Sequence, residues 1–382
     1  MTYKRLGDYI REVNVRNRDE KVTNLQGVSI SKMFIPSIAN TIGTDMSTYK
    51  IVKPGQFAYG PVTSRNGDKV SIALYDDSED AIISQAYTVF DVIDKNEVSN
   101  KYLMMWFQRP EFDRYARFHS HGSAREIFDW DELCNVMLPL PSIERQREIV
   151  EEYETLTSRI QLNEQMIQNL EATAQTLYRK MFVDGIDKEN LPEGWRMGTL
   201  GDYVELSQGI QVEVEDQSLI KKNGFNRFIR IIDYTPNSTE PPRYVNISNK
   251  RYYATKDDVV MIRYGDAGTV CRGIEGIIAN NLFKVTPINS ISRNYVYLFL
   301  KSEPIQKEIR GSAASSTMPA ITHTAVKELQ CVIPPYSVMQ DYDANIDVLE
   351  REIFVKREEN SKLKELQSLL LAKMGRSTSG RL

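Results

Sequence analysis

The order of sequence signals in this chain occurs twice, about 194 residues apart. Leu6-Gly7-Asp8-Tyr9 returns as Leu200-Gly201-Asp202-Tyr203, and each copy opens a stretch of globular composition. Each stretch closes on prolines, Leu138-Pro139-Leu140-Pro141 in the first copy and Ile333-Pro334-Pro335 in the second. A long charged segment follows each stop and ends on Lys-Met both times. Solenoid repeats run only roughly 20 to 50 residues, so the period indicates a duplicated unit of one globular domain and one helix.

The two charged segments carry the apolar spacing of long helices. From Ile149 to Met181 the apolar residues step alternately by four and three residues, which is a heptad seam with one polar residue, Asn163. The segment from Tyr342 to Met374 uses the same steps with a more polar middle. We expect both helices, each roughly 50 Å long, to pair antiparallel within the chain; pairing between two chains is the alternative. The seam residues expected at this contact are Leu156, Ile160, Ile167, Leu170, Leu349, Ile353, Leu363 and Leu370.

The globular stretches read as α+β domains. Residues 70–75 alternate like a half-buried strand, and residues 258–264 do so more loosely. Glycine turns surround both segments. Residues 102–107 and 295–300 are apolar runs that we expect in short buried helices. Each stretch, at about 135 residues, is long enough for a core of its own.

The net charge of −4 conceals an uneven distribution along the chain. Residues 1–137 carry 17 basic and 19 acidic side chains, and residues 195–335 carry 17 and 14. Much of the acidic excess lies on residues 138–194, with 6 basic and 11 acidic side chains. Near-neutral globular units attract phosphate only modestly. Either a partner adds positive surface, or the chain does not bind DNA.

Three cysteines without a C-x-x-C spacing predict reduced thiols in a cytoplasmic protein. The three histidines complete no metal-ligand pattern, so we expect neither a metal nor another cofactor. No apolar run approaches the ~18 residues of a membrane span, and the N-terminus lacks a signal-peptide core. We therefore expect no membrane association.

The duplicated order of these signals resembles the specificity (S) subunit of type I DNA restriction-modification systems. Besides the Leu-Gly-Asp openings and the proline stops, Leu191-Pro192-Glu193-Gly194-Trp195 is typical of how this family enters its second target-recognition domain. Gly/Ser-rich turns precede the stops at Gly122-Ser123 and Ser316-Thr317. The resemblance covers nearly the whole chain, and its one departure, Pro334-Pro335-Tyr336 in place of Leu-Pro-x-Pro, concerns local geometry.

The resemblance implies two similar target-recognition domains separated by two antiparallel coiled-coil helices, in a pseudo-two-fold duplication. It implies that each domain reads half of a split site in double-stranded DNA through the major groove. The helices would dock methyltransferase subunits, two of them, and restriction subunits would join through that complex. Catalysis would belong to those other chains. The expected boundaries are 1–137 and 195–335 for the domains, 138–184 and 336–376 for the helices, 185–194 for a linker and 377–382 for a tail.

In the first domain the polar loop from Thr63 to Lys69 is the best candidate for DNA contact. The residues selected in it are Thr63, Ser64, Arg65, Asn66 and Lys69, and the second candidates are Ser29, Ser31 and Lys32. A solvated surface loop without a ligand is the alternative for both segments.

In the second domain Arg263 and Asn281 lie in polar stretches near two glycines. Arginine can bond to guanine through two donors, and asparagine can bond to adenine in a similar way, so both residue types suit base reading. They could equally cap turns. Arg227 and Arg230 are expected to touch phosphate as readily as bases.

A catalytic interpretation fails at Pro334-Pro335-Tyr336. Amino-methyltransferases need an Asp, Asn or Ser before such a segment to accept from the target amine, and Ile333 cannot do so. No glycine-rich loop for S-adenosylmethionine accompanies it. We therefore predict a non-enzymatic DNA-specificity subunit. A coiled-coil scaffold whose globular ends bind protein is the other candidate.

Overall fold

The computed structural model describes residues 3–37, 43–64, 66–67, 69–122, 126–235, 238, 240–289, 291–313 and 320–375. The chain forms two compact units. Unit 1 combines Met1–Leu162 with Asn360–Leu382, and unit 2 is Asn163–Glu359. Both long helices contribute to both units.

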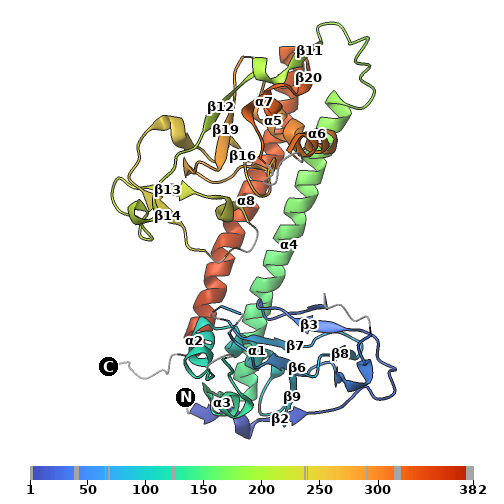
Figure 1. Ribbon diagram of the computed structural model, residues 1–382, viewed down its shortest axis with the longest axis vertical. Coiled ribbons are helices and arrows are strands. Elements are labelled where there is room, and N and C mark those ends of the chain that lie inside the picture. The colour runs from blue at the N-terminus through green and yellow to red at the C-terminus, as the bar shows by residue number, and fades with distance from the viewer. Residues whose placement is uncertain are drawn as a thin grey trace. The chain divides into compact units, whose positions relative to one another are not determined.

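Unit 1 is built on a four-stranded antiparallel sheet, with the helices labelled in Figure 1 beside it. The strand order is β2 (Ile10–Val13), β9 (Thr88–Val92), β6 (Phe57–Gly60) and β7 (Ser71–Leu74). The three short helices are α1 (Asn100–Phe107), α2 (Pro110–Phe118) and α3 (Trp130–Cys134). The remaining strands pair as β1 (Tyr3–Arg5) with β10 (Met137–Pro139), β3 (Gln26–Val28) with β4 (Phe34–Pro36), and β5 (Lys50–Val52) with β8 (Ala81–Ile83).

Unit 2 repeats this topology. Its main sheet has the order β12 (Val204–Gln208), β19 (Leu282–Pro287), β16 (Val259–Ile262) and β17 (Val270–Cys271). The short helices are α5 (Arg293–Lys301), α6 (Glu303–Ala313) and α7 (His323–Lys327). β11 (Arg196–Thr199) pairs with β20 (Gln330–Ile333), and a second sheet runs β14 (Arg243–Val245), β13 (Asn226–Ile229), β18 (Gly276–Ile278) and β15 (Tyr253–Ala254). The predicted α+β duplication is confirmed.

The repeat extends to single hydrogen bonds. The Tyr102 hydroxyl donates to the carbonyl of Pro139 (3.0 Å), and the Tyr295 hydroxyl donates to that of Val332 (2.5 Å). Ser99 caps α1 by accepting from the Tyr102 amide, and Ser292 caps α5 in the same way. Each tyrosine is fully buried and joins its helix to the closing strand of its unit, so the two cores are locked by the same contact.

The repeated Leu-Gly-Asp phrase forms a 3-10 turn that packs against the last short helix of each unit. A Cβ atom on Gly7 would lie 2.8 Å from the Cys134 Cβ, and one on Gly201 would lie 2.9 Å from the Lys327 Cβ. Real Cβ atoms do not approach so closely, so only glycine fits at these two places. This close approach gives a physical reason for the most regular motif in the sequence.

The long helices are α4 (Ile143–Phe182) and α8 (Tyr336–Met374), and they run antiparallel within each unit. In unit 1 the Gln367 side-chain amide donates to the Thr157 hydroxyl (2.7 Å). In unit 2 the rings of Phe182 and Tyr342 lie 4.8 Å apart. The contacts step forward along α4 as they step backward along α8, so the predicted pairing within one chain is confirmed. Gly185 follows α4 with φ 74°, a left-handed conformation that suits glycine at a helix end.

This pairing predicts an intrachain crosslink. With Thr157→Cys and Gln367→Cys together, a short bismaleimide should link the two helices inside one chain at low protein concentration. Ser158→Cys with Ser368→Cys is the matched control, because both serines are exposed one residue farther around each helix. Denaturing electrophoresis and peptide mass spectrometry measure the product. Dimers from the first pair, without an internal link, would contradict the arrangement.

Candidate nucleic-acid interface

The two loops that the sequence singled out occupy the same position in the repeated fold. In unit 1 the segment after β6 is fixed by the bridge Val62↔Ile127 and by the Phe128 amide, which donates to the Pro61 carbonyl (2.9 Å). In unit 2 the segment after β16 has the bridge Tyr264↔Ala320, and the Ile321 amide donates to the Arg263 carbonyl (3.0 Å). The predicted loop of unit 1 and the Arg263 segment of unit 2 are therefore structural counterparts.

The unit 1 loop is anchored by two of its predicted residues and exposes others. The buried Thr63 hydroxyl lies 3.0 Å from the Ser120 hydroxyl and 3.2 Å from the Glu126 carbonyl oxygen. The Asn66 amide donates to the Val62 carbonyl (3.0 Å) and the Ser71 hydroxyl (3.2 Å). Ser64 is exposed and Lys69 half-buried, whereas Arg65 lies outside the described residues. Thr63 and Asn66 hold the loop in shape through their hydrogen bonds. Of the predicted residues that the structure describes, Ser64 and Lys69 are the ones that a ligand can reach.

The second predicted segment of unit 1 also has one exposed residue and one buried residue. Ser31 is exposed, with its hydroxyl 2.9 Å from that of Ser29. The Lys32 side chain is only 5% exposed, and its ammonium lies 2.8 Å from Asp113 Oδ1. Burial lowers the pKa of Lys32, although Asp113 opposes that shift. The geometry argues against Lys32 as a DNA contact, because its charge is buried inside the unit.

Arg227 and Arg230 are also held by a carboxylate. Asp233, with a side chain 3% exposed, lies 3.3 Å from the Arg227 guanidinium and 3.1 Å from Arg230 Nε. Arg230 donates as well to the Pro241 carbonyl (3.0 Å). These bonds shape the segment after β13. Arg227 stays partly exposed, whereas the Arg230 side chain is 17% exposed and bonded to Asp233 and Pro241.

Arg263 and Asn281 are brought together, and a histidine that the sequence analysis did not select joins them. The Arg263 amide donates to the Asn281 carbonyl (2.9 Å). Arg263 Nε, Asn281 Oδ1 and His323 Nε2 are buried atoms that lack a hydrogen-bond partner in the described part of the chain. Burial, Arg263 and Lys327 all lower the pKa of His323, so its imidazole is neutral at pH 7. Unsatisfied buried polar atoms are costly in a folded protein and call for an explanation.

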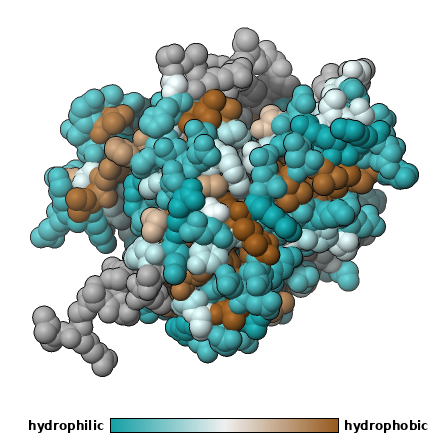
Figure 2. All heavy atoms as spheres, turned by 90° about the horizontal axis from the view of Figure 1, so that it is seen from below, coloured by the Kyte–Doolittle hydropathy of each residue, from teal (hydrophilic) through white to brown (hydrophobic). Residues whose placement is uncertain are grey.

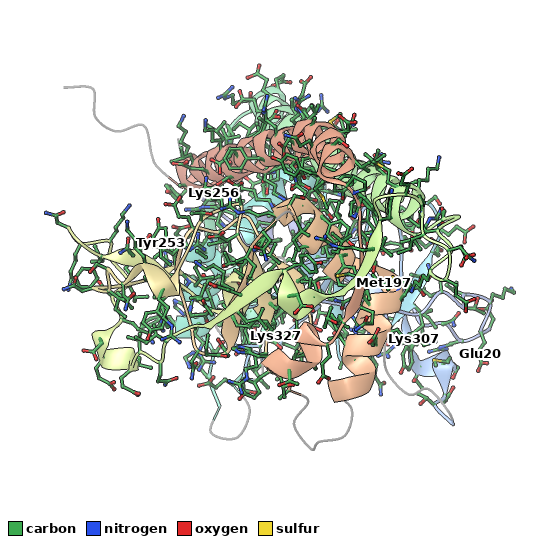
Figure 3. The ribbon with its side chains drawn as sticks, turned by 90° about the horizontal axis from the view of Figure 1, so that it is seen from above. Glu20, Met197, Tyr253, Lys256, Lys307 and Lys327 are labelled. Atoms are coloured by element: carbon green, nitrogen blue, oxygen red, sulfur yellow. The ribbon has the colours of Figure 1, made fainter. Side chains whose placement is uncertain are left out.

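Lysines distinguish the two sides of unit 2. Lys256 lies 3.4 Å from Glu358 on α8, so its side of the unit faces that helix. In Figure 3, Lys327, the last residue of α7, lies on a different side of unit 2 from Lys256. Lys327, one of the two positive charges that lower the pKa of His323, thus lies away from the side where Lys256 meets α8.

The predicted coiled-coil residues lie on the packed seam of the helices. Ile160 and Ile353 are 6% and 2% exposed. Burying such a side chain contributes about 2 kcal/mol to folding. The other six predicted seam residues are half-buried: Leu156, Ile167, Leu170, Leu349, Leu363 and Leu370. The buried Asn360 donates to the Ile160 carbonyl (3.3 Å), a polar contact of the kind that fixes register in coiled coils.

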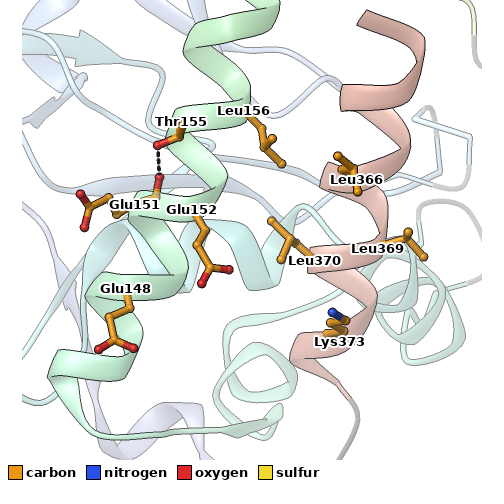
Figure 4. A pocket seen from close by; sticks show the side chains of 9 residues that line it. All are labelled: Glu148, Glu151, Glu152, Thr155, Leu156, Leu366, Leu369, Leu370 and Lys373. Carbon is orange, nitrogen blue, oxygen red and sulfur yellow. Dashed lines mark hydrogen bonds between the residues drawn. The ribbon is translucent and has the colours of Figure 1, made fainter. Parts of the chain in front are cut away.

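A leucine-lined groove opens between α4 and α8 within unit 1 (Figure 4). Its volume is about 650 Å³. The apolar lining is Leu156, Leu366, Leu369 and Leu370, and the rim carries Glu148, Glu151, Glu152 and Lys373. Leu366 and Leu369 are 48% and 52% exposed. Exposed leucines in a concave surface with an acidic rim suit a basic amphipathic partner helix.

Two further properties bear on the class of the protein. No helix in the described ranges has both the length and the apolar content that a bilayer crossing requires. Among the same residues, no three His, Cys, Asp or Glu side chains gather as a metal site would need. Figure 2 shows hydrophobic residues on one face as separate patches between hydrophilic ones.

Comparison with known proteins points to one family. The sequence model described as "Type I restriction modification DNA specificity domain" matches residues 38–172 and again 192–365. The type I restriction enzyme MjaIX specificity subunit of Methanocaldococcus jannaschii is 22% identical over 307 residues, which cover 74% of this chain and 70% of that protein. The HindI specificity subunit of Haemophilus influenzae is 25% identical over 186 residues, or 47% of this chain and 40% of that one.

One solved structure shares the fold over almost the full length. The S subunit of a type I restriction-modification system from M. genitalium superimposes with a TM-score of 0.58. The match covers 99% of this chain and 96% of that one, at 15% sequence identity. At this identity the likeness establishes the fold, and the family is shown by the sequence model, which matches most of the chain.

Proposed function

Because the chain belongs to the type I restriction modification DNA specificity family, we propose that it is the sequence-reading subunit of a type I restriction-modification complex. Each unit reads one half of a bipartite site in double-stranded DNA. The long helices dock methyltransferase subunits, and restriction subunits join through these. The chain carries out no chemical step of its own and works in the cytoplasm.

The observation that carries this proposal is the equivalence of the two loops. The segments after β6 and β16 are held by matching bridges and matching backbone hydrogen bonds. A duplicated fold that presents a polar loop at the same place in each copy offers two similar surfaces for two half-sites. The loops differ in sequence, Thr63–Lys69 against Arg263–Gly268, so each surface can prefer different bases.

The side chains in unit 2 suit base recognition. Arg263 can donate two hydrogen bonds to guanine, and the Asn281 amide can donate and accept with adenine. A neutral His323 imidazole can either donate or accept. Because Arg263 Nε, Asn281 Oδ1 and His323 Nε2 are buried here, these side chains would have to turn outward to meet a base edge.

The test is to sequence the methylated bases of the host genome with and without this gene. We expect one split sequence, two short specified halves around an unspecified spacer, to lose methylation when the gene is deleted. Salt-dependent binding to duplex DNA in the presence of a methyltransferase partner should accompany it. A methylome that does not change, with no binding to duplex, would favour a protein-binding scaffold.

The groove between α4 and α8 is our candidate for the methyltransferase contact. Leu366→Ser with Leu369→Ser should weaken binding of the methyltransferase subunit about tenfold or more, because both leucines are half exposed and apolar. Isothermal titration calorimetry measures the change. The matched control is Leu219→Ser with Ile220→Ser, two leucine-sized exposed residues of unit 2 that lie off the helices. If both pairs of substitutions weaken methyltransferase binding equally, the groove is not the binding site for that subunit.

A further inference from the structure

One carboxylate in unit 1 ties together both segments that the sequence predicted to face DNA. Asp113, on α2, lies 2.8 Å from the Lys32 ammonium in the turn between β3 and β4. The same oxygen accepts from the amide of Val70, at the end of the Thr63–Lys69 loop (3.1 Å). The two segments are 31 residues or more apart in sequence, and Asp113 gives them a shared fixed point.

Lys32 is built into the unit rather than laid on its surface. Its backbone has φ 62°, a left-handed conformation that is uncommon for lysine. The ammonium also donates to the Phe107 carbonyl and lies 5.3 Å from the centre of the Phe112 ring. A buried ion pair with additional hydrogen bonds contributes little net stability, yet breaking it is costly. Such a pair is suited to setting geometry.

Residues next to Lys32 and in the loop point outward. On the turn, Ile30 and Met33 are 51% and 58% exposed, and Ser31 between them is exposed as well. On the loop, Ser64 and Gly67 are exposed. The inward-pointing Lys32 therefore anchors the β3–β4 turn, and the buried Thr63 anchors the Thr63–Lys69 loop. Both segments keep exposed residues on the surface of unit 1.

We propose that Lys32 and Asp113 are positioning residues, which hold the β3–β4 turn and the Thr63–Lys69 loop in one register and so set the bases that unit 1 accepts. The inference rests on the proposed function of the chain. It assigns no DNA contact to either residue. A shift of the turn relative to the loop would change which donors and acceptors meet the first half-site.

The test uses three variants of the full chain in complex with its methyltransferase partner: Lys32→Met, Asp113→Leu and the two together. Each complex selects from a pool of random duplexes, and the bound sequences are read. We expect all three to lower the preference for the native base about tenfold at one or more positions of the first half-site. The second half-site should keep its preference, because unit 2 is untouched.

Thermal unfolding separates positioning from mere stability. Each single variant leaves one buried charge without its partner, whereas the double variant replaces the pair by apolar groups. The Tm should therefore fall in the single variants and recover in the double variant, while the altered base preference persists. If base preference recovers together with the Tm, the pair has only a structural role and the proposal is overturned.

Lys50→Met is the matched control. Lys50 is another buried lysine of unit 1, 3.6 Å from Glu12, and burial lowers its pKa as it does for Lys32. Lys50 belongs to β5 and so to neither the turn nor the loop. This variant should lose stability without a change in base preference. A wild-type complex that selects no split site would refute the proposed function, whereas unchanged preference in all three variants would refute only this inference.

Discussion

Exchange of residues 1–137 for the matching domain of another family member should change one half of the methylated sequence and leave the other half intact. Each unit has its own sheets and its own core, so recognition should move with the unit. Methylation of the native site should fall about a hundredfold or more, since several base contacts are lost together. Sequencing of methylated DNA from cells that carry the chimera measures both halves. A change in both halves would contradict independent reading.

The design of this chimera follows from the core of unit 1. Val150 of α4 and Leu371 and Met374 of α8 are buried with the domain. The donor residues that pack on these three positions should be kept as they are in this chain. A second chimera that exchanges the unit 2 domain, residues 195–335, is the reciprocal control and should change the other half only.

The second expected result is that methyl transfer appears only when a methyltransferase subunit is added. The globular domains carry almost as much acid as base: 17 basic and 19 acidic residues in 1–137, and 17 and 14 in 195–335. Few counterions are then released when the chain binds DNA alone. A partner that adds phosphate contacts should tighten specific binding by about two orders of magnitude.

Titration of the partner into a fixed amount of chain, with labelled duplex and S-adenosylmethionine, measures binding and methylation together. An unrelated duplex of equal length is the control for binding that ignores sequence. Methyl transfer by the chain alone would overturn the division of roles, and so would specific binding at full strength without the partner.

The long helices could be predicted because their contacts are periodic in sequence. The buried Asn163 and Asn360 fall on the spacing that also places Ile160 and Ile353 inward. The duplicated domains could be predicted because the same short sequence recurs where the same packing constraint recurs. At Gly7 and Gly201, for example, a side chain would collide with the neighbouring helix. The heptad spacing is local and the duplicated motif is repeated, so both can be recognised in the sequence without knowledge of long-range contacts.

The site could be predicted only in outline. The loops were found because polar residues cluster in them, but the direction of each side chain depends on distant partners. Lys32 is turned inward by Asp113, 81 residues away, and no local pattern reveals this. Arg230 and Asp233 are three residues apart, so that pair did leave a signal in the sequence. His323 left none, because its relation to Arg263 and Asn281 exists only after folding.

Unit 1 draws its residues from both ends of the described chain. Leu371 and Met374 belong to its core, and the Tyr3 hydroxyl donates to the Gly375 carbonyl (3.0 Å). During synthesis at roughly 5 to 20 residues per second, some tens of seconds therefore pass before residues 360–375 are made and can pack onto the first domain. Unit 2, whose residues are contiguous from Asn163 to Glu359, can close earlier. The part of unit 1 that α8 covers is therefore completed after the chain of unit 2 has been made, and until then it stays open to chaperones or partner subunits.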